Sequence, residues 1–286
     1  MILFNDRPTL EEAWDKTSFR VLMGGFGDDF AMLLAELFHR GYEPDEIVFC
    51  DTGSEFPHTY QFIEYVKAWC EANNWSKVVH LRKLDKFKQP LKLIEVVEKE
   101  KTLPAAAFGK KSCSLRYKVE TADKYFNNHP KAHEAWGVTR KGAKLDTHTG
   151  SILRMVGLNA DEPGRVARWS PEHKWCQVFP LFDWDIGERE SKVVEAIGLY
   201  YPGKSSCFMC PHLTGGELFM LMTEYPELFL RVWNLEQNYI ENQRTPESTT
   251  KGLCRSLTIA EKLEKWAEKG GDYDPNSESK CNTCHG

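Results

Sequence analysis

Short hydrophobic runs separated by glycine-rich turns open this chain and predict a strand, helix, strand unit. Residues 19–23 form an apolar run, residues 24–29 break it, and residues 31–38 are apolar enough for a buried helix. A second apolar run, residues 47–50, ends at Asp51-Thr52-Gly53. A right-handed crossover would bring both turns to the carboxyl edge of one parallel sheet, where open α/β sheets bind ligands. The pattern therefore predicts a nucleotide site at these two turns.

The alternation of helical and strand patterns continues beyond this unit. Periodic apolar residues predict helices over 57–74, 90–100 and 117–126. Apolar runs predict strands over 78–81 and 152–157, and a short strand or extended segment over 178–181. Strands that alternate with helices favour a doubly wound, mainly parallel sheet flanked by helices. We expect the fold class α/β, with about five strands.

The last third of the chain has a helical pattern. Thr214 with Glu217, and Thr258 with Glu261, have the spacing of a capping box, and an apolar stripe extends over 228–240. We therefore expect two regions: an α/β nucleotide-binding domain over residues 1–200, and a helical, cysteine-containing region over 201–286 that packs on it.

Composition narrows the class of protein. With 286 residues, 41% of them hydrophobic and 28% charged, the chain is long enough for a full core. No apolar stretch near the N-terminus reaches the length of a signal or a membrane span, so we expect a cytoplasmic protein with no membrane partner. Nine cysteines without a secretory signal favour free thiols or metal ligands over structural disulfides.

The formal charge of −5 conceals a basic segment. Residues 77–118 hold twelve Lys or Arg against four Asp or Glu. Such a segment is suited to phosphate groups, and it predicts a contact with nucleic acid. A solvated helix face explains most of these lysines equally well.

The glycine turn has residue types suited to anion binding. Glycines between a strand and a helix let backbone amides approach an anion, and Gly24, Gly25 and Gly27 meet that requirement. The acids Asp28 and Asp29 would place negative charge beside that anion. They fit either as Mg²⁺ ligands or as N-caps of the following helix, and the cap is the favoured role for at least one of them.

Three segments resemble one known family. They are Asp51-Thr52-Gly53-Ser54-Glu55-Phe56-Pro57, the run from Met155 to Arg165, and Lys204-Ser205-Ser206-Cys207-Phe208-Met209-Cys210-Pro211. Together they resemble the phosphoadenosine phosphosulfate (PAPS) reductase family of the PP-loop adenine nucleotide alpha hydrolase superfamily. The Cys-x-x-Cys-Pro segment is similar to that of its phage and bacterial branches, which include relatives in DNA phosphorothioation systems.

The resemblance implies a fold, a ligand and a set of contacts. It implies an adenine nucleotide, ATP or a PAPS-like compound, bound together with Mg²⁺. The nucleotide-binding residues would be Gly24, Gly25, Gly27, Asp51, Thr52, Gly53, Asp161, Glu162 and Arg165. The chain departs from the family at the PP-loop, because both serines of Ser-Gly-Gly-x-Asp-Ser are replaced and Phe26 stands for its second glycine. Asp28 keeps the family's aspartate.

The cysteines form a second set of candidates. Cys207 and Cys210, like Cys281 and Cys284, have the two-residue spacing used for Zn²⁺ and for iron–sulfur clusters. Cys113 resembles a family cysteine that ligates a [4Fe–4S] cluster, so one arrangement uses Cys113, Cys207, Cys210 and either Cys281 or Cys284. The other is a zinc site made by the two pairs. Cys50, Cys70 and Cys176 are expected to be inert core thiols.

The resemblance implies reductive or sulfur-transfer chemistry, with Cys113, Asp28 and Arg116 as the catalytic candidates. A nucleic acid is one expected acceptor, and a thioredoxin-like protein or a cysteine desulfurase is an expected partner. The altered PP-loop leaves an alternative of a different class: a non-catalytic nucleotide-binding or interaction protein with a structural metal site.

Overall fold

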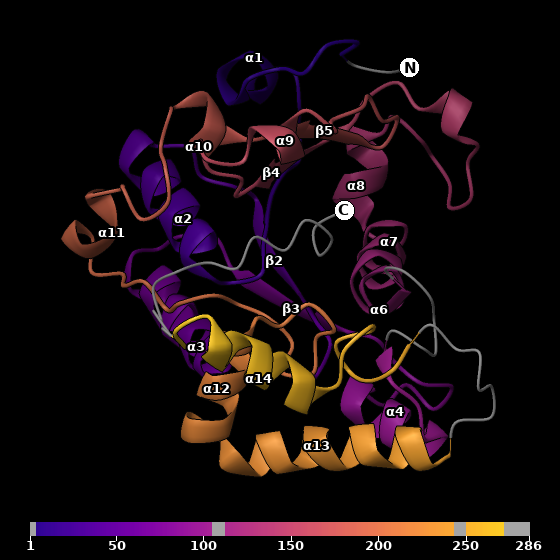
Figure 1. Ribbon diagram of the computed structural model, residues 1–286. Helices are drawn as coiled ribbons and strands as arrows, with labels where there is room; N and C mark the ends of the chain where they lie inside the picture. Colours follow the sequence, from indigo (N-terminus) through magenta and orange to yellow (C-terminus); the bar gives the residue numbers. More distant parts are fainter. Residues whose placement is uncertain (1–3, 105–111, 243–249, 272–286) are drawn as a thin grey trace. The chain divides into compact units, whose positions relative to one another are not determined.

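The computed structural model describes residues 4–104, 112–242 and 250–271, and its centre is a five-stranded parallel sheet (Figure 1). The strand order is β3-β2-β1-β4-β5. The strands are β1 (Arg20–Met23), β2 (Glu46–Asp51), β3 (Val78–Arg82), β4 (Ile152–Val156) and β5 (Trp175–Val178). The fold class is therefore α/β, as the alternation of patterns predicts.

Both faces of the sheet are buried, and successive residues of each strand explain how. In β1, Val21 joins one apolar cluster and Leu22 joins another on the opposite face. β4 does the same, with Ile152 in the first cluster and Leu153 in the second. A strand that is covered on both faces has an uninterrupted apolar sequence, which is the pattern of the short runs in this chain.

Contacts divide the chain into two compact units, each made of several segments. The first unit consists of residues 1–50, 57–81 and 121–205, and the second of residues 51–56, 82–120 and 206–286. The expected boundary at residue 200 stays a prediction.

The first unit contains the helices that cover the sheet. α2 (Asp28–Arg40) and α3 (Pro57–Ala72) pack into one apolar cluster, and α7 (Glu120–Phe126) and α8 (Pro130–Ala135) contribute to the other. The remaining helices of this unit are short: α1 (Leu10–Trp14), the 3₁₀ turn η2 (Leu145–Thr147), α9 (Pro163–Val166), α10 (Pro180–Asp183) and α11 (Val193–Ala196).

The second unit is helical around its own core. α12 (Gly215–Glu224), α13 (Pro226–Glu241) and α14 (Ile259–Glu268) pack with α4 (Leu93–Glu100) around Leu218, Val232 and Leu253. Arg231 of α13 forms an ion pair of 2.5 Å with Glu98 of α4. Before α7 the chain forms α6 (Ser112–Ser114) and a π-helical turn, η1 (Leu115–Val119).

Both predicted capping boxes are confirmed. The hydroxyl of Thr214 accepts a hydrogen bond from the backbone of Glu217, whose carboxylate accepts one from the backbone of Thr214. Thr258 and Glu261 make the same reciprocal pair at the start of α14. Each box satisfies two amide groups that a helix N-terminus would otherwise leave unpaired.

Two local expectations are wrong. The N-cap of α2 is Gly27, so neither Asp28 nor Asp29 caps the helix, and both lie in its first turn. The strand expected over 178–181 lies earlier, at Trp175–Val178, because Pro180 begins the helix α10. Proline is well suited to the first helical turn, where its missing amide hydrogen is not needed.

Among the helices in the described part of the chain, none combines the length and the apolar character needed to cross a membrane.

Candidate functional site

The strand order has one reversal point, between β1 and β4. From β1 the chain proceeds outward to β2 and β3, and it later returns to place β4 on the other side of β1. In open α/β sheets the turns at such a point diverge and leave a crevice at the carboxyl ends of the strands. Here those turns are the glycine turn after β1 and the segment from Gly157 to Arg165 after β4.

Close backbone approach explains the glycines of the first turn. A Cβ atom on Gly24 would lie 2.5 Å from the ring of Phe30. A Cβ atom on Gly27 would lie 2.8 Å from the backbone nitrogen of Ser205, so the segment ending at Ser205 passes directly against this turn. Both glycines are therefore required by packing, in addition to any role in binding an anion.

Phe26 occupies the position where the family has a glycine. Its φ angle is +62°, in the left-handed region that favours glycine. Its side chain is fully buried, stacks on Phe30 at 3.9 Å between ring centroids, and meets Phe49 edge to face at 5.2 Å. Aromatic burial offsets the backbone strain, so the turn keeps a glycine-like conformation without a glycine.

Asp28 is buried and fully engaged. Its Oδ2 accepts a hydrogen bond of 2.6 Å from Nε of Arg189, and its Oδ1 accepts one of 2.8 Å from the backbone nitrogen of Gly203. The guanidinium of Arg189 also lies over the ring of Tyr201, 5.5 Å from its centroid. Asp28 thus links the first turn of α2 to residues 189–203.

Asp29 points toward the turn after β4. The side-chain amide of Asn159 donates a hydrogen bond of 2.9 Å to Oδ1 of Asp29. Burial raises the pKa of Asp29 to about 7, the Asn159 hydrogen bond opposes that change, and the negative charge of Glu162 adds to it. The two turns at the reversal point therefore meet through Asp29 and Asn159.

The predicted nucleotide residues of the second turn are paired with one another. Arg165 donates a hydrogen bond to Oε1 of the buried Glu162. Asp161 is exposed, and its Oδ2 accepts a hydrogen bond of 2.9 Å from the backbone nitrogen of Glu188. Asp161 therefore holds the segment that carries Arg189, while Glu162 and Arg165 stay beside Asp29.

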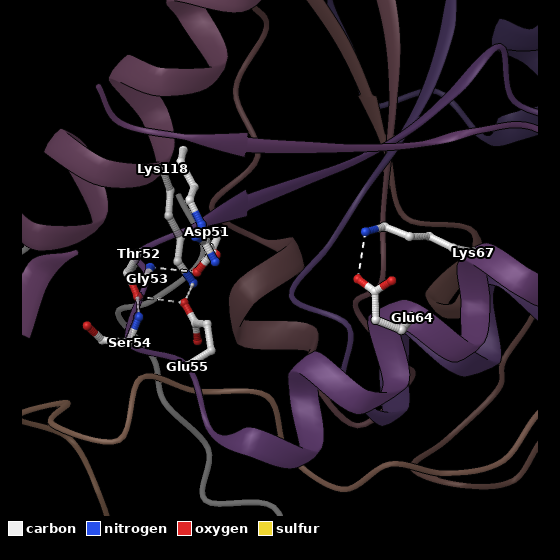
Figure 2. Close-up of polar contacts among 9 residues, drawn as sticks. Asp51, Thr52, Gly53, Ser54, Glu55, Glu64, Lys67 and Lys118 are labelled. Atoms are coloured by element: carbon white, nitrogen blue, oxygen red, sulfur yellow. Dashed lines mark hydrogen bonds and ion pairs between the residues drawn. The ribbon is translucent and has the colours of Figure 1, made fainter. Parts of the chain in front are cut away.

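The remaining predicted nucleotide residues, Asp51, Thr52 and Gly53, belong to the second unit. Figure 2 shows this turn with Glu55 and Lys118 beside it. Nε of Arg82 lies 2.6 Å from the fully buried carboxylate of Asp51, which also accepts a hydrogen bond of 2.6 Å from the backbone nitrogen of Gly53. A cavity shared by Gly24, Asp51 and Arg165 stays a prediction.

Glu55 is a second buried acid in the same turn. Its Oε1 accepts a hydrogen bond of 3.0 Å from the hydroxyl of Thr52, and Nζ of Lys118 lies 3.5 Å from it. Its backbone pairs with that of Cys207 in an antiparallel bridge. The turn that begins at Asp51 is therefore hydrogen-bonded through its backbone to the segment around Cys207, the first cysteine of the Cys-x-x-Cys pair.

The second unit brings three predicted metal ligands to one core. Cys113, Cys207 and Cys210 all pack against the apolar cluster of this unit, and Cys113 is near enough to Cys207 to raise the pKa of its thiol. Burial is the main cause of the raised pKa of each of the two thiols, and the charge of Glu55 raises both while Lys118 lowers both. At neutral pH these groups are protonated thiols unless a bound metal ion displaces the protons.

Thiolates are suitable ligands for zinc and for iron–sulfur clusters, but two of the five predicted cysteine ligands lie outside the described residues. No group of three or more His, Cys, Asp or Glu residues within the described ranges is arranged to hold a metal ion. Cys281 and Cys284 lie outside those ranges, so both the cluster and the zinc arrangement stay predictions. The three expected core thiols, Cys50, Cys70 and Cys176, are buried as predicted.

Four basic side chains of the segment 77–118 form ion pairs within its described part. Arg82 pairs with Asp51, Lys83 with Glu120 at 3.2 Å, Lys92 with Glu95 at 3.1 Å, and Lys118 with Glu55. Arg116 is exposed, and its backbone oxygen accepts a hydrogen bond from Lys83. Lys110 and Lys111 lie outside the described residues. The catalytic role of Arg116 and the nucleic-acid contact stay predictions.

Sequence reasoning missed two side chains that define this site, Arg189 and Asn159. Arg189 lies 161 positions from Asp28 and Asn159 lies 130 positions from Asp29. No local spacing signals such pairs. The one available signal is Asp29 itself, because the PP-loop of the family that the chain resembles has a serine at this position.

Comparisons with known proteins do not assign the chain to a family. No family model matches the chain. An uncharacterized protein of Methanocaldococcus jannaschii is 26% identical over 255 residues, which is 84% of this chain, and the chain spans 46% of that relative's length. A crystal structure of the phosphoadenylyl-sulfate (PAPS) reductase from Candida auris, in complex with phosphate, is 15% identical and has a TM-score of 0.36. That match covers 68% of this chain and 79% of the reductase chain.

Proposed function

We propose that this chain binds an adenine nucleotide, with Mg²⁺, at the reversal point between β1 and β4, and uses it in PAPS-reductase-like reductive or sulfur-transfer chemistry. One observation carries the proposal: the glycine turn after β1 and the turn after β4 meet there, joined by the hydrogen bond from Asn159 to Asp29. The turn after β4 contains the segment from Met155 to Arg165, which resembles the family, and the glycine turn stands at the position of the family's PP-loop.

Backbone amides and Arg165 are the groups that would bind phosphate. Gly24, Gly25 and Gly27 precede α2, a helix of 13 residues whose N-terminus favours negative charge. Arg165 has 13% of its side chain exposed and is held in place by Glu162, so its guanidinium is preorganised to contact a phosphate or sulfate group.

The thiols of the second unit supply the sulfur side of the proposal. Cys113, Cys207 and Cys210, completed by Cys281 or Cys284, would hold a [4Fe–4S] cluster, and the zinc arrangement is the alternative. Either metal would supply the positive charge that keeps these buried thiols deprotonated. A nucleic acid is the expected acceptor, and a thioredoxin-like protein or a cysteine desulfurase the expected source of electrons or sulfur.

The first experiment measures nucleotide binding. We expect calorimetry to detect binding of ATP or of PAPS in the presence of Mg²⁺, and we expect Arg165→Ala to weaken it at least tenfold. Arg168→Ala removes an exposed arginine from the turn just after the same short helix and serves as the matched control. Equal affinities for the two variants, with unchanged melting temperatures, would remove Arg165 from the site.

A second candidate function is nucleotide binding without turnover. It is favoured by Phe26, whose buried ring replaces a glycine, and by the absence of both PP-loop serine hydroxyls. Release of pyrophosphate from ATP, or of sulfite from PAPS with a thiol reductant, decides between the two. Tight binding with neither product supports the non-catalytic function.

The metal is tested separately by anaerobic purification. Brown protein that contains iron and labile sulfide supports the cluster, whereas colourless protein with one zinc supports the structural site. A nucleic-acid acceptor predicts affinity for DNA or tRNA that falls steeply with salt concentration.

A further inference from the structure

Two acidic residues lie on the two turns that meet at the reversal point of the sheet. Asp29 lies in the first turn of α2, after β1, and Glu162 lies at the start of α9, after β4. Asn159 connects them: its side-chain amide donates a hydrogen bond to Oδ1 of Asp29, and its backbone oxygen accepts one of 3.2 Å from the backbone nitrogen of Glu162. Asn159 fixes the direction of Asp29, and Arg165 fixes the direction of Glu162.

Glu162 carries an oxygen with no partner. The residue is only 9% exposed, and its Oε2 is buried without a hydrogen bond to any described residue. A buried carboxylate oxygen accepts hydrogen bonds or binds a cation, and leaving it unsatisfied is costly. The orphaned oxygen therefore indicates a missing donor or cation beside it.

The neighbouring charges favour a cation. Asp28, Asp29 and Glu162 supply three acids, and the arginines beside them, Arg165 and Arg189, are each already paired with one of these acids. A nucleotide phosphate would add further negative charge to this group. A metal ion that bridges the carboxylates and the phosphate removes that conflict.

Asp28 is less suited than Asp29 as a metal ligand, because Arg189 already pairs with its charge. Arg189 and the backbone of Gly203 already occupy its two oxygens. Asp29 makes one hydrogen bond through Oδ1, from Asn159, which leaves coordination positions open on its carboxylate.

The small number of protein ligands at this position favours Mg²⁺ over ions that need a complete shell of protein groups. No set of three or more ligating acids, histidines or cysteines is found within the described ranges, so protein groups alone do not complete a shell here. Mg²⁺ is commonly bound by one or two carboxylates, with water and substrate phosphates filling its other positions.

We propose that Asp29 and Glu162 bind a Mg²⁺ ion that is completed by the phosphates of the bound nucleotide. This inference rests on the proposed function, because the nucleotide supplies part of the coordination shell. It also explains why this chain has an acid at position 29, where the family has a serine. In this proposal the carboxylate of Asp29 contacts the phosphate through the metal ion, whereas a serine hydroxyl at this position would contact the phosphate directly.

Mn²⁺ provides the test, because its electron paramagnetic resonance signal reports the free ion. We expect wild-type protein to bind one Mn²⁺ in the presence of ATP and to bind it at least tenfold more weakly without nucleotide. Asp29→Asn keeps the acceptor for Asn159 and Glu162→Gln keeps the acceptor for Arg165, and each should lower the ATP-dependent affinity at least tenfold. Asp185→Asn, an exposed acid of the same unit, should leave it unchanged.

Parallel titrations of ATP with a chelator separate this inference from the proposed function. ATP binding that is unaffected by Mn²⁺ and by both substitutions would overturn the cation site and leave nucleotide binding intact. No ATP binding under either condition would overturn both. Circular dichroism confirms folding of each variant, and if Glu162→Gln does not fold, Asp29→Asn alone decides the outcome.

Discussion

The guanidinium of Arg189 holds the buried carboxylate of Asp28 through Nε at 2.6 Å, although the two residues are 161 positions apart. Asp28 is 1% exposed, so removal of the arginine would leave a buried charge that still accepts a hydrogen bond from the amide of Gly203 but has lost its cationic partner. We expect Arg189→Ala to lower the free energy of unfolding by about 3 kcal/mol. Urea denaturation followed by circular dichroism measures it.

The matched control for this pair is Lys192→Ala, an exposed cation a few positions further along. Its effect should stay within about 0.5 kcal/mol. Adding Asp28→Asn to Arg189→Ala should recover part of the loss, because the uncompensated charge disappears. If the losses in free energy of unfolding caused by Arg189→Ala and Asp28→Asn simply add in the double variant, the two residues are not coupled and this account is wrong.

Phe26 combines a left-handed backbone with a fully buried ring. Phe26→Ala keeps the strain and loses the packing, so we expect a loss of about 3 to 5 kcal/mol in the free energy of unfolding. Phe26→Leu should lose less, since it keeps most of the apolar volume. Thermal melting compares the two, and equal melting temperatures for Phe26→Ala and wild type would show that the ring does not stabilise the turn.

Two core thiols should resist alkylation. Burial raises the pKa of Cys70 to about 12 and that of Cys176 to about 12, so at pH 8 almost no thiolate is present. In folded protein freed of bound metal with a chelator and treated with iodoacetamide, mass spectrometry should find both unmodified while the partly exposed Cys210 is labelled. Urea should make all three reactive. Rapid native labelling of Cys70 would show that α3 opens locally.

Glu236 of α13 is hydrogen-bonded to the segment that leads into α14. Its carboxylate accepts hydrogen bonds from the backbone nitrogens of Leu253, at 2.6 Å, and Ile259, at 3.0 Å. Glu236→Ala would leave both buried amides unpaired and should lower the free energy of unfolding by about 2 to 4 kcal/mol. Glu236→Gln keeps one oxygen in place and should lose less.

The same carboxyl group gives a pH dependence of defined sign. Burial raises the pKa of Glu236 above its ordinary value of 4.5. The folded state therefore keeps a proton that the unfolded state loses first, and the free energy of unfolding falls as pH rises from 4.5 to the folded pKa. Subtracting the Glu236→Gln curve from that of wild type isolates this component, and a difference that grows with pH would contradict the assignment.

The sequence predicted the elements better than the site. Apolar periodicity located α2, α3 and the strands to within a few residues, and the two capping boxes were exact in position because they depend on neighbours three residues apart. The nucleotide edge was expected after the first two strands. That location stays a prediction. The strand order places the reversal point between β1 and β4, and this order depends on long-range pairing that no local pattern records.

Phe26 illustrates a different limit. In the sequence it reads as the loss of a glycine and hence as damage to the anion-binding turn. In the structure its ring stacks on Phe30 and the backbone keeps a glycine-like angle. Only the partners of the ring, which come from β2 and α3 as well as α2, distinguish these two interpretations.

The segmental make-up of the two units governs how this chain can be divided. The polypeptide passes from one unit to the other after residues 50, 56, 81, 120 and 205. No single cut of the backbone therefore releases either unit as one uninterrupted piece, and a gene truncated after residue 205 would encode residues 51–56 and 82–120 without the helices that complete their core. A fragment of this chain should therefore fold only when the complementary fragment is produced with it, because each unit needs segments from both sides of any cut.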